Sequence, residues 1–214
     1  MTNYDKTEDF REAVIHCRNE FPDAPIYLMG ISMGAMNIQR YLIDYSEDPQ
    51  VVGACTISSP WCSKVSAKKL ANCKIFMKFL LMEYKGLIKE HYKHDHYRNL
   101  LKEKGICWNR CMQAKSNVDF DAHYGLLDSG LDSLSELYQK MDSYHSIEEV
   151  SVPMLSINSL SDLVIESTCA PLKKFPQTER LMHLEVGCGG HIEYFSGIKA
   201  DMVIFLFSNC IVGF

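Results

Sequence analysis

Apolar positions in the first sixty residues switch between helical and strand-like spacing. The helical positions are Phe10, Ala13, Val14, Cys17 and Phe21. They predict a helix with Thr7 as a cap before it, ending at Pro22. Short apolar runs at Ile26–Met29 and Val51–Ile57 have strand length, and a helical pattern over Ala35–Tyr45 separates them. This order of strand, helix and strand is typical of a parallel sheet with crossover helices.

The rhythm breaks between residues 63 and 150, a segment rich in Lys, Tyr, His and Leu that predicts several helices. Strand-like runs return at Met154–Ile157 and Leu181–Val186. We therefore predict one α/β domain over residues 1–214. Its sheet is mostly parallel with flanking helices, and a helical cap is inserted at about 63–150.

Composition is that of a globular protein, with 47% apolar and 23% charged residues among 214. The net charge of −5 comes without a basic stripe, which argues against nucleic acid as a partner. The polar start of the chain is unlike a signal peptide, and the apolar tail from Met202 to Phe214 is too short to span a bilayer.

The cysteines and histidines predict neither a disulfide framework nor a metal site. Nine scattered cysteines, an odd number without a C-x-x-C pair, favour reduced thiols and an intracellular location. His91, His94 and His96 cluster, and His91 and His94 could share a helix face and bind a metal, but the charged residues beside them favour a solvated face. No cofactor is expected.

The segment Gly30-Ile-Ser32-Met-Gly34 matches G-x-S-x-G between a predicted strand and a predicted helix. Such a turn holds the serine hydroxyl above the sheet, and the flanking glycines avoid collisions. It also places the Met33 N–H, at a helix start, beside developing negative charge, so Met33 is the candidate oxyanion donor. The alternative is an ordinary serine in a glycine-flanked turn.

A serine nucleophile needs a base that an acid orients. Asp162 follows the strand Met154–Ile157, and His191 follows the strand Leu181–Val186. Their order along the chain and their places after strands predict a triad of Ser32, Asp162 and His191. Taken singly, Asp162 could be a helix cap and His191 a loop residue without a role.

From about Thr7 to Gly197 the chain resembles the YheT-like branch of the α/β-hydrolase superfamily, also called AB hydrolase family 4. The motifs that carry the resemblance are Thr7-Glu-Asp, Gly30-Ile-Ser-Met-Gly-Ala, Gln113-Ala-Lys-Ser, Asp119-Phe-Asp121, Val152-Pro-Met-Leu-Ser-Ile-Asn158, Ser161-Asp162, Gly189-Gly-His191-Ile and Gly197. The resemblance implies the same triad and a partial α/β-hydrolase fold. Members of the family include membrane-anchored phospholipases, and Ser161 stands where they usually have a second acidic residue.

Relatives of this kind have a long part before the first helix, with a membrane anchor, further strands and the loop of a second oxyanion donor. The resemblance therefore implies an N-terminally truncated chain that is a weak or silent hydrolase by itself. Losing one oxyanion donor costs about 100- to 1000-fold in rate. The alternative is a non-catalytic fragment or isoform that binds or regulates a partner.

The function predicted is that of a serine ester hydrolase, a carboxylesterase or phospholipase working through an acyl-enzyme. The substrate would be a lipid-like or short-chain ester, and a membrane surface is a possible partner. The location would be cytoplasmic or membrane-associated. The stretch Ile75–Met82 could face lipid, with ordinary packing against the sheet as the alternative.

Overall fold

The computed structural model describes residues 7–175, 178–187, 189–192, 194–196 and 201–202. Gly197 and the apolar tail beyond Met202 lie outside these ranges. No helix in the described ranges has the length and apolar character needed to cross a membrane. The described cysteines other than Cys55 are free thiols.

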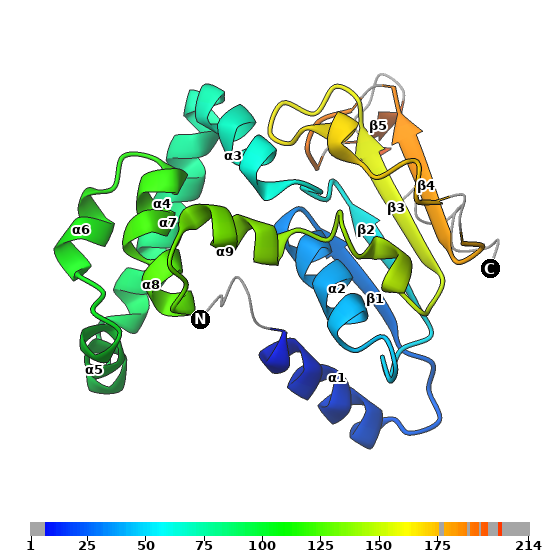
Figure 1. Ribbon diagram of the computed structural model, residues 1–214, viewed down its shortest axis with the longest axis horizontal. Coiled ribbons are helices and arrows are strands. Elements are labelled where there is room, and N and C mark those ends of the chain that lie inside the picture. Colours follow the sequence, from blue (N-terminus) through cyan, green and yellow to red (C-terminus); the bar gives the residue numbers. More distant parts are fainter. Residues whose placement is uncertain (1–6, 176–177, 188, 193, 197–200, 203–214) are drawn as a thin grey trace.

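A four-stranded parallel sheet forms the centre of the molecule (Figure 1). Its strands lie in the order β1 (Tyr27–Ile31), β2 (Gly53–Ile57), β3 (Met154–Ser159) and β4 (Leu181–Val186). A separate short antiparallel pair joins β5 (Phe195–Ser196) to β6 (Asp201–Met202). Because β1 to β4 are parallel, their carboxyl ends meet at one edge, where Ser32, Asp162 and His191 follow three of them.

Helix α2 (Met33–Asp44) packs against β1 and β2 and buries the apolar face that its spacing predicts. Its buried residues include Ile38, Tyr41 and Leu42, which join the main core cluster. Helix α1 (Glu8–Glu20) is far less buried than its spacing predicts, since Val14 is its one buried residue. Phe21, just after it, is 64% exposed, because α1 contacts the core through only one edge of its apolar stripe.

Thr7 does not cap α1 as predicted. Its side chain makes no capping hydrogen bond, and its hydroxyl donates instead to Asp44 Oδ2 at 2.7 Å. The hydroxyl thus ties the start of α1 to the end of α2. A tertiary acceptor has displaced the local bond that the sequence suggested.

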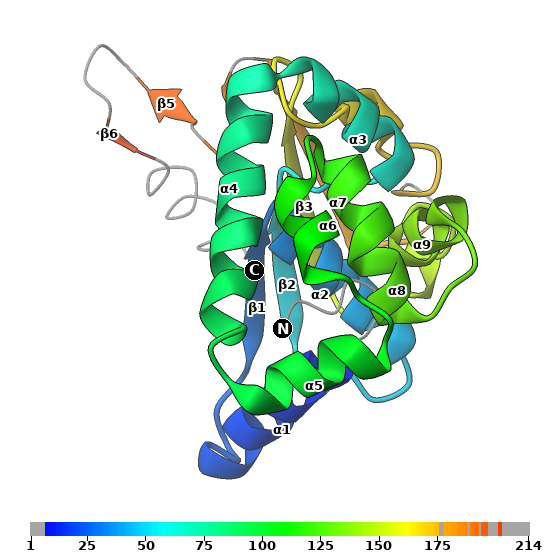
Figure 2. The same cartoon turned by 90° about the vertical axis from the view of Figure 1, so that its left-hand side faces the viewer.

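Seven α-helices occupy the chain between β2 and β3, where residues 63–150, all of them described, contain no strand. They are α3 (Ser63–Asn72), α4 (Lys74–His91), α5 (Asp95–Glu103), α6 (Trp108–Gln113), α7 (Asn117–His123), α8 (Gly125–Ser129) and α9 (Leu134–Met141), followed by the 3-10 turn η1 (Ile147–Glu149). Figure 1 shows most of these helices beside the sheet, and in Figure 2, where they face the viewer, the long α4 stands upright. Buried residues of α4, α5, α6 and α7 form a cluster separate from the core of the sheet.

Glycine at position 30 lets α2 lie directly on β1. A Cβ atom there would stand 2.5 Å from the Gly34 carbonyl oxygen and 2.7 Å from Ile38 Cδ1. We expect Gly30→Ala to lower the free energy of unfolding by about 2 kcal/mol, because the contacted backbone cannot move aside. Denaturant unfolding measures the change.

Gly34→Ala is the matched control, since a Cβ at Gly34 meets nothing within 4 Å. It lies in α2, where alanine is favoured over glycine, so its stability should be unchanged or slightly higher. Equal losses in the two variants would contradict the close approach at Gly30.

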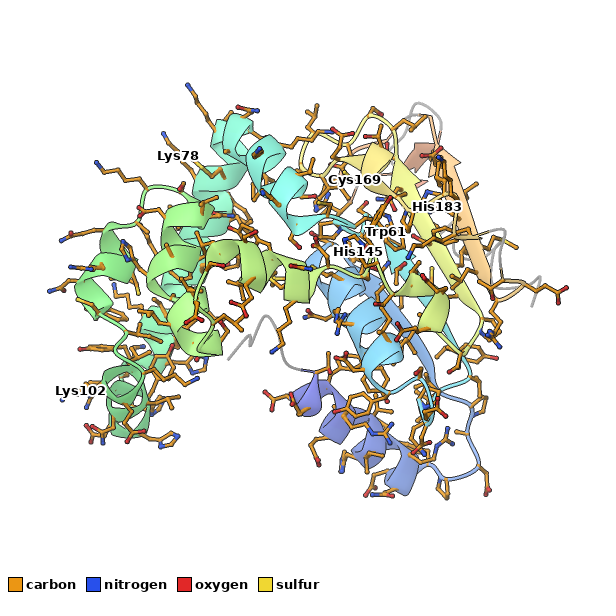
Figure 3. The ribbon with its side chains drawn as sticks, viewed as in Figure 1. Trp61, Lys78, Lys102, His145, Cys169 and His183 are labelled. Carbon is orange, nitrogen blue, oxygen red and sulfur yellow. The ribbon has the colours of Figure 1, made fainter. Side chains whose placement is uncertain are left out.

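Both ring nitrogens of His183 on β4 are buried, and neither has a hydrogen-bond partner in the described structure. Its ring lies 5.2 Å from that of Phe175 and 6.2 Å from that of Trp61, which Figure 3 labels beside it. Burial lowers the pKa of His183 from 6.5 to about 4. Between about pH 4 and pH 6.5 the folded protein therefore holds this histidine neutral, whereas an unfolded chain would protonate it.

The stability linked to His183 should be complete above pH 6.5 and should be lost as the pH falls toward 4. The loss is on the order of 2 kcal/mol, allowing for partial exposure of the residue. His183→Leu should flatten this part of the pH dependence in denaturant unfolding between pH 7 and 4.5. His145 is exposed, so the control variant His145→Leu should show the same pH dependence as the wild type. Parallel pH curves for wild type and His183→Leu would contradict the assignment.

Candidate active site

Ser32 occupies the turn between β1 and α2, with φ 56° and ψ −121°. Few residues other than glycine adopt a positive φ, so the turn holds strain of about 1–3 kcal/mol. The Ser32 N–H donates to the Ile57 carbonyl oxygen at 2.8 Å, which fixes the turn to the end of β2. The sharp turn predicted from G-x-S-x-G is therefore present, and α2 begins two residues earlier than predicted.

The structure brings the three predicted residues together at the carboxyl edge of the sheet. His191 Nε2 lies 2.7 Å from Ser32 Oγ, and His191 Nδ1 lies 2.8 Å from Asp162 Oδ2. Asp162 is 2% exposed and His191 is 9% exposed. Residues separated by up to 159 positions in sequence thus form one continuous line of hydrogen bonds.

The partners of Asp162 determine which nitrogen of His191 carries the proton. The backbone N–H groups of Val164 and Ile165 donate to Asp162 Oδ1, at 2.7 and 3.1 Å. The other oxygen, Oδ2, accepts from His191, so the proton sits on Nδ1. Nε2 then bears a lone pair, which accepts the hydrogen bond of the Ser32 hydroxyl and can take up its proton.

Met33, the predicted oxyanion donor, is the first residue of α2. Backbone N–H groups in the first turn of a helix have no intrahelical acceptor and point along the positive end of the helix dipole. By this rule the Met33 N–H has no acceptor within α2, and its role as an oxyanion donor stays a prediction.

Two serines tie the loop of Asp162 to the loop of His191, which the sequence did not predict. The hydroxyls of Ser159 and Ser161 each donate to the Gly189 carbonyl oxygen at 3.0 Å. The Gly189 N–H in turn lies 3.2 Å from Ser161 Oγ. Ser161, the residue directly before Asp162, thus helps to hold the histidine loop.

A cavity of about 350 Å³ opens beside Ser32 and extends among the helices between β2 and β3. Its walls are mostly apolar, from Ile31, Met33, Met36, Leu70, Phe76, Leu80, Met141, Val164 and Ile165 among others. The ring of Phe76 also meets the His191 imidazole edge to face at 5.7 Å. An ester with an apolar chain would fit against these walls.

No group of three or more His, Cys, Asp or Glu side chains in the described part of the chain could hold a metal ion. His94 caps no backbone group through its side chain at the start of α5, and His96 is exposed. His123 pairs with Asp119 at 3.4 Å on α7.

Comparisons with known proteins agree with this fold. The family model described as serine aminopeptidase, S33 (Hydrolase_4) matches residues 3–179. The structure of a Paleococcus ferrophilus monoacylglycerol lipase superposes with a TM-score of 0.53 at 12% identity, over 98% of this chain and 75% of that one. At this identity the likeness establishes the fold alone, and it confirms the predicted α/β-hydrolase class.

Two relatives by sequence carry hydrolase names. Phospholipase ABHD3 of Homo sapiens is 26% identical over 196 residues, which cover 90% of this chain and 46% of that protein. Medium-chain fatty acid ethyl ester synthase/esterase 2 of Saccharomyces cerevisiae is 24% identical over 214 aligned positions, covering 88% and 46%. The chain spans about half the length of the curated relatives it matches. The family model covers most of the chain, and on that match the chain belongs to the Hydrolase_4 (serine aminopeptidase, S33) family of the α/β-hydrolase superfamily.

Proposed function

We propose that this chain is a serine ester hydrolase that works through an acyl-enzyme. The observation that carries the proposal is the line of hydrogen bonds from Asp162 through His191 to Ser32, at 2.8 and 2.7 Å. Such a line supplies a nucleophile, a base and an orienting acid in one arrangement. The names of the relatives support the hydrolysis of an ester or lipid.

In the proposed reaction Ser32 Oγ attacks the ester carbonyl carbon while His191 Nε2 takes the hydroxyl proton. Asp162 stabilises the resulting imidazolium, and the Met33 N–H donates to the oxyanion. His191 then passes its proton to the leaving alcohol, which departs and leaves an acyl group on Ser32. A water molecule then attacks the carbonyl carbon of the acyl group on Ser32 while His191 takes up a proton from it. His191 returns this proton to Ser32 Oγ as the carbonyl–oxygen bond breaks, which releases the carboxylic acid and the free enzyme.

We propose a lipid-like substrate, with the helices between β2 and β3 as a cap over its apolar chain. The largely apolar walls of the cavity support this substrate class. Residues Ile75, Phe79 and Met82 recur on one face of α4 and are 87%, 54% and 60% exposed. This face supports contact with a membrane surface, whereas Leu80 and Phe76 of the same helix line the cavity.

The finer family assignment that we propose is the YheT-like branch, AB hydrolase family 4. Its support is the motif set quoted above, together with the likeness to phospholipase ABHD3. A phospholipid or a simpler carboxylic ester is the proposed substrate, and the proposed location is intracellular, in the cytoplasm or at a membrane.

A fluorophosphonate probe tests the proposal, because it reacts covalently with an activated serine. We expect labelling of the wild type and of the control Ser46→Ala, and none of Ser32→Ala. Hydrolysis of a nitrophenyl ester should follow the same pattern, whereas an amino-acid nitroanilide should be a poorer substrate. Labelling that persists in Ser32→Ala, or an unlabelled wild type, would overturn the proposal. Faster anilide cleavage would change the reaction class to a peptidase.

A further inference from the structure

Several residues that line the cavity beside Ser32 carry polar side chains. Four of them are Ser66 of α3, Asn117 and Asp121 of α7, and Tyr138 of α9. We call these four residues the polar wall. The rest of the lining is largely apolar. An apolar chain in the cavity would leave the hydrogen-bonding groups of the polar wall without partners.

Two atoms of the polar wall are buried without a hydrogen-bond partner in the described structure, namely Asn117 Oδ1 and Ser66 Oγ. Their residues are 8% and 6% exposed. A buried polar atom left unpaired costs about 1–3 kcal/mol of desolvation. Both residues line the cavity, so a bound molecule that reached these atoms would satisfy them.

Asp121 adds a third acceptor to the polar wall. The Tyr138 hydroxyl donates to Asp121 Oδ2 at 2.9 Å. Burial raises the pKa of the Asp121 carboxyl to about 6, and the bond from Tyr138 opposes that rise. At neutral pH the group is largely a carboxylate, which accepts hydrogen bonds and donates none.

The backbone holds α7 so that it presents this wall. Ser116 Oγ accepts from the Asp119 N–H at 3.1 Å, and Asp119 Oδ2 accepts from the Lys115 N–H at 2.8 Å. These bonds cap α7 and fix its first turn. Asn117 and Asp121 follow at i and i+4 on the same helix face, which explains why both reach the cavity.

The wall fits a hydroxyl group better than an anion. Its carboxylate and amide oxygen are acceptors, and the residues that line this cavity in the described structure include no lysine or arginine. A phosphate or carboxylate would meet repulsion from Asp121 with no cation to offset it. A hydroxyl donates to such acceptors, and Ser66 can donate to its oxygen in return.

We propose that Ser66, Asn117 and Asp121 form a hydroxyl-binding subsite, which selects esters that bear a free hydroxyl in either the alcohol or the acyl part. The inference rests on the proposed function, because the bound compound is an ester only if the chain is an ester hydrolase. In the alcohol part the hydroxyl would be that of a partial ester of a polyol; in the acyl part it would be that of a hydroxy acid. The competing occupant is a water molecule that satisfies the same atoms and selects nothing.

Binding of ethers tests the subsite without turnover, since an ether cannot be hydrolysed. Three matched compounds serve: octyl propyl ether, octylglycerol ether, and octyl propyl ether with a hydroxyl at the far end of the octyl chain. Isothermal titration calorimetry of the full chain below micelle-forming concentrations gives their dissociation constants. We expect one hydroxylated ether to bind at least about tenfold more tightly than octyl propyl ether. Which one binds tighter assigns the hydroxyl to the alcohol or to the acyl part.

Two variants locate the effect in the polar wall. Asn117→Leu and Ser66→Ala should each reduce the preference for the hydroxylated ether by about threefold to tenfold, because each removes one hydrogen-bonding partner. Asn72→Leu, at an exposed position of α3, is the control and should keep the full preference. The smaller change at Ser66 keeps the test valid if Asn117→Leu does not fold.

The outcomes separate this inference from the proposed function. Equal affinities for all three ethers, or a preference unchanged in both variants, would mean that the wall holds water, and the subsite would be rejected. Labelling of Ser32 by a fluorophosphonate would be unaffected by that result. Preferential ether binding with an unlabelled Ser32 would keep the subsite and reject the hydrolase.

Discussion

Replacing His191 with glutamine should lower kcat/KM for an ester by about five orders of magnitude, the largest effect that we expect. Glutamine can still hydrogen-bond to Ser32 and Asp162, but its amide cannot take the hydroxyl proton. The imidazole that is lost is 9% exposed and packs against the ring of Phe76. The rate is measured with a nitrophenyl ester, together with the rate of fluorophosphonate labelling.

His145→Gln is the control for this substitution. His145 is exposed and lies outside the cavity, and its neighbour in the structure is the ring of Tyr144. Its activity should equal that of the wild type. A loss below about tenfold in His191→Gln would show that another group activates Ser32.

Asp162→Asn should lower kcat by about 10⁴-fold while the fold stays intact. Oδ1 of the asparagine can keep the two bonds from Val164 and Ile165, which directs its NH₂ group at His191 Nδ1. The imidazole must then accept at Nδ1 and carry its proton on Nε2, so it can no longer accept the proton of Ser32. Kinetics on the ester measure the loss, and thermal unfolding checks the fold.

The double variant His191→Gln and Asp162→Asn sharpens this prediction. Once the base is absent, the orienting acid has nothing to act on, so the double variant should be no slower than His191→Gln alone. Losses that multiply would mean that Asp162 acts independently of His191, and the line of hydrogen bonds would not be the working unit.

The geometry of the site followed from local sequence because each candidate stands directly after a strand. Once Ile26–Met29, Met154–Ile157 and Leu181–Val186 are recognised as parallel strands, Ser32, Asp162 and His191 must meet at one edge. The turn at Ser32 follows from G-x-S-x-G for the same reason, since its strain and its glycines are local properties.

Features that depend on tertiary contacts did not follow from the sequence. Periodicity predicted the apolar stripe of α1, but burial of that stripe depends on which other elements of the fold pack against it. The bonds from Ser159 and Ser161 to Gly189 join two loops across about 28 residues of sequence. The polar wall joins α3, α7 and α9, and its one visible signal was Asp119-Phe-Asp121 among the motifs of the resemblance.

At Ser32 the backbone conformation that the reaction needs lowers the thermal stability of the protein. Its positive φ is a conformation that glycine would adopt freely and that serine adopts at a cost. Any change that relaxes this turn would make the protein harder to melt and would swing the hydroxyl away from His191. Selection for heat resistance alone would therefore favour changes that inactivate the site. Substitutions meant to raise the melting temperature should be placed elsewhere in the fold.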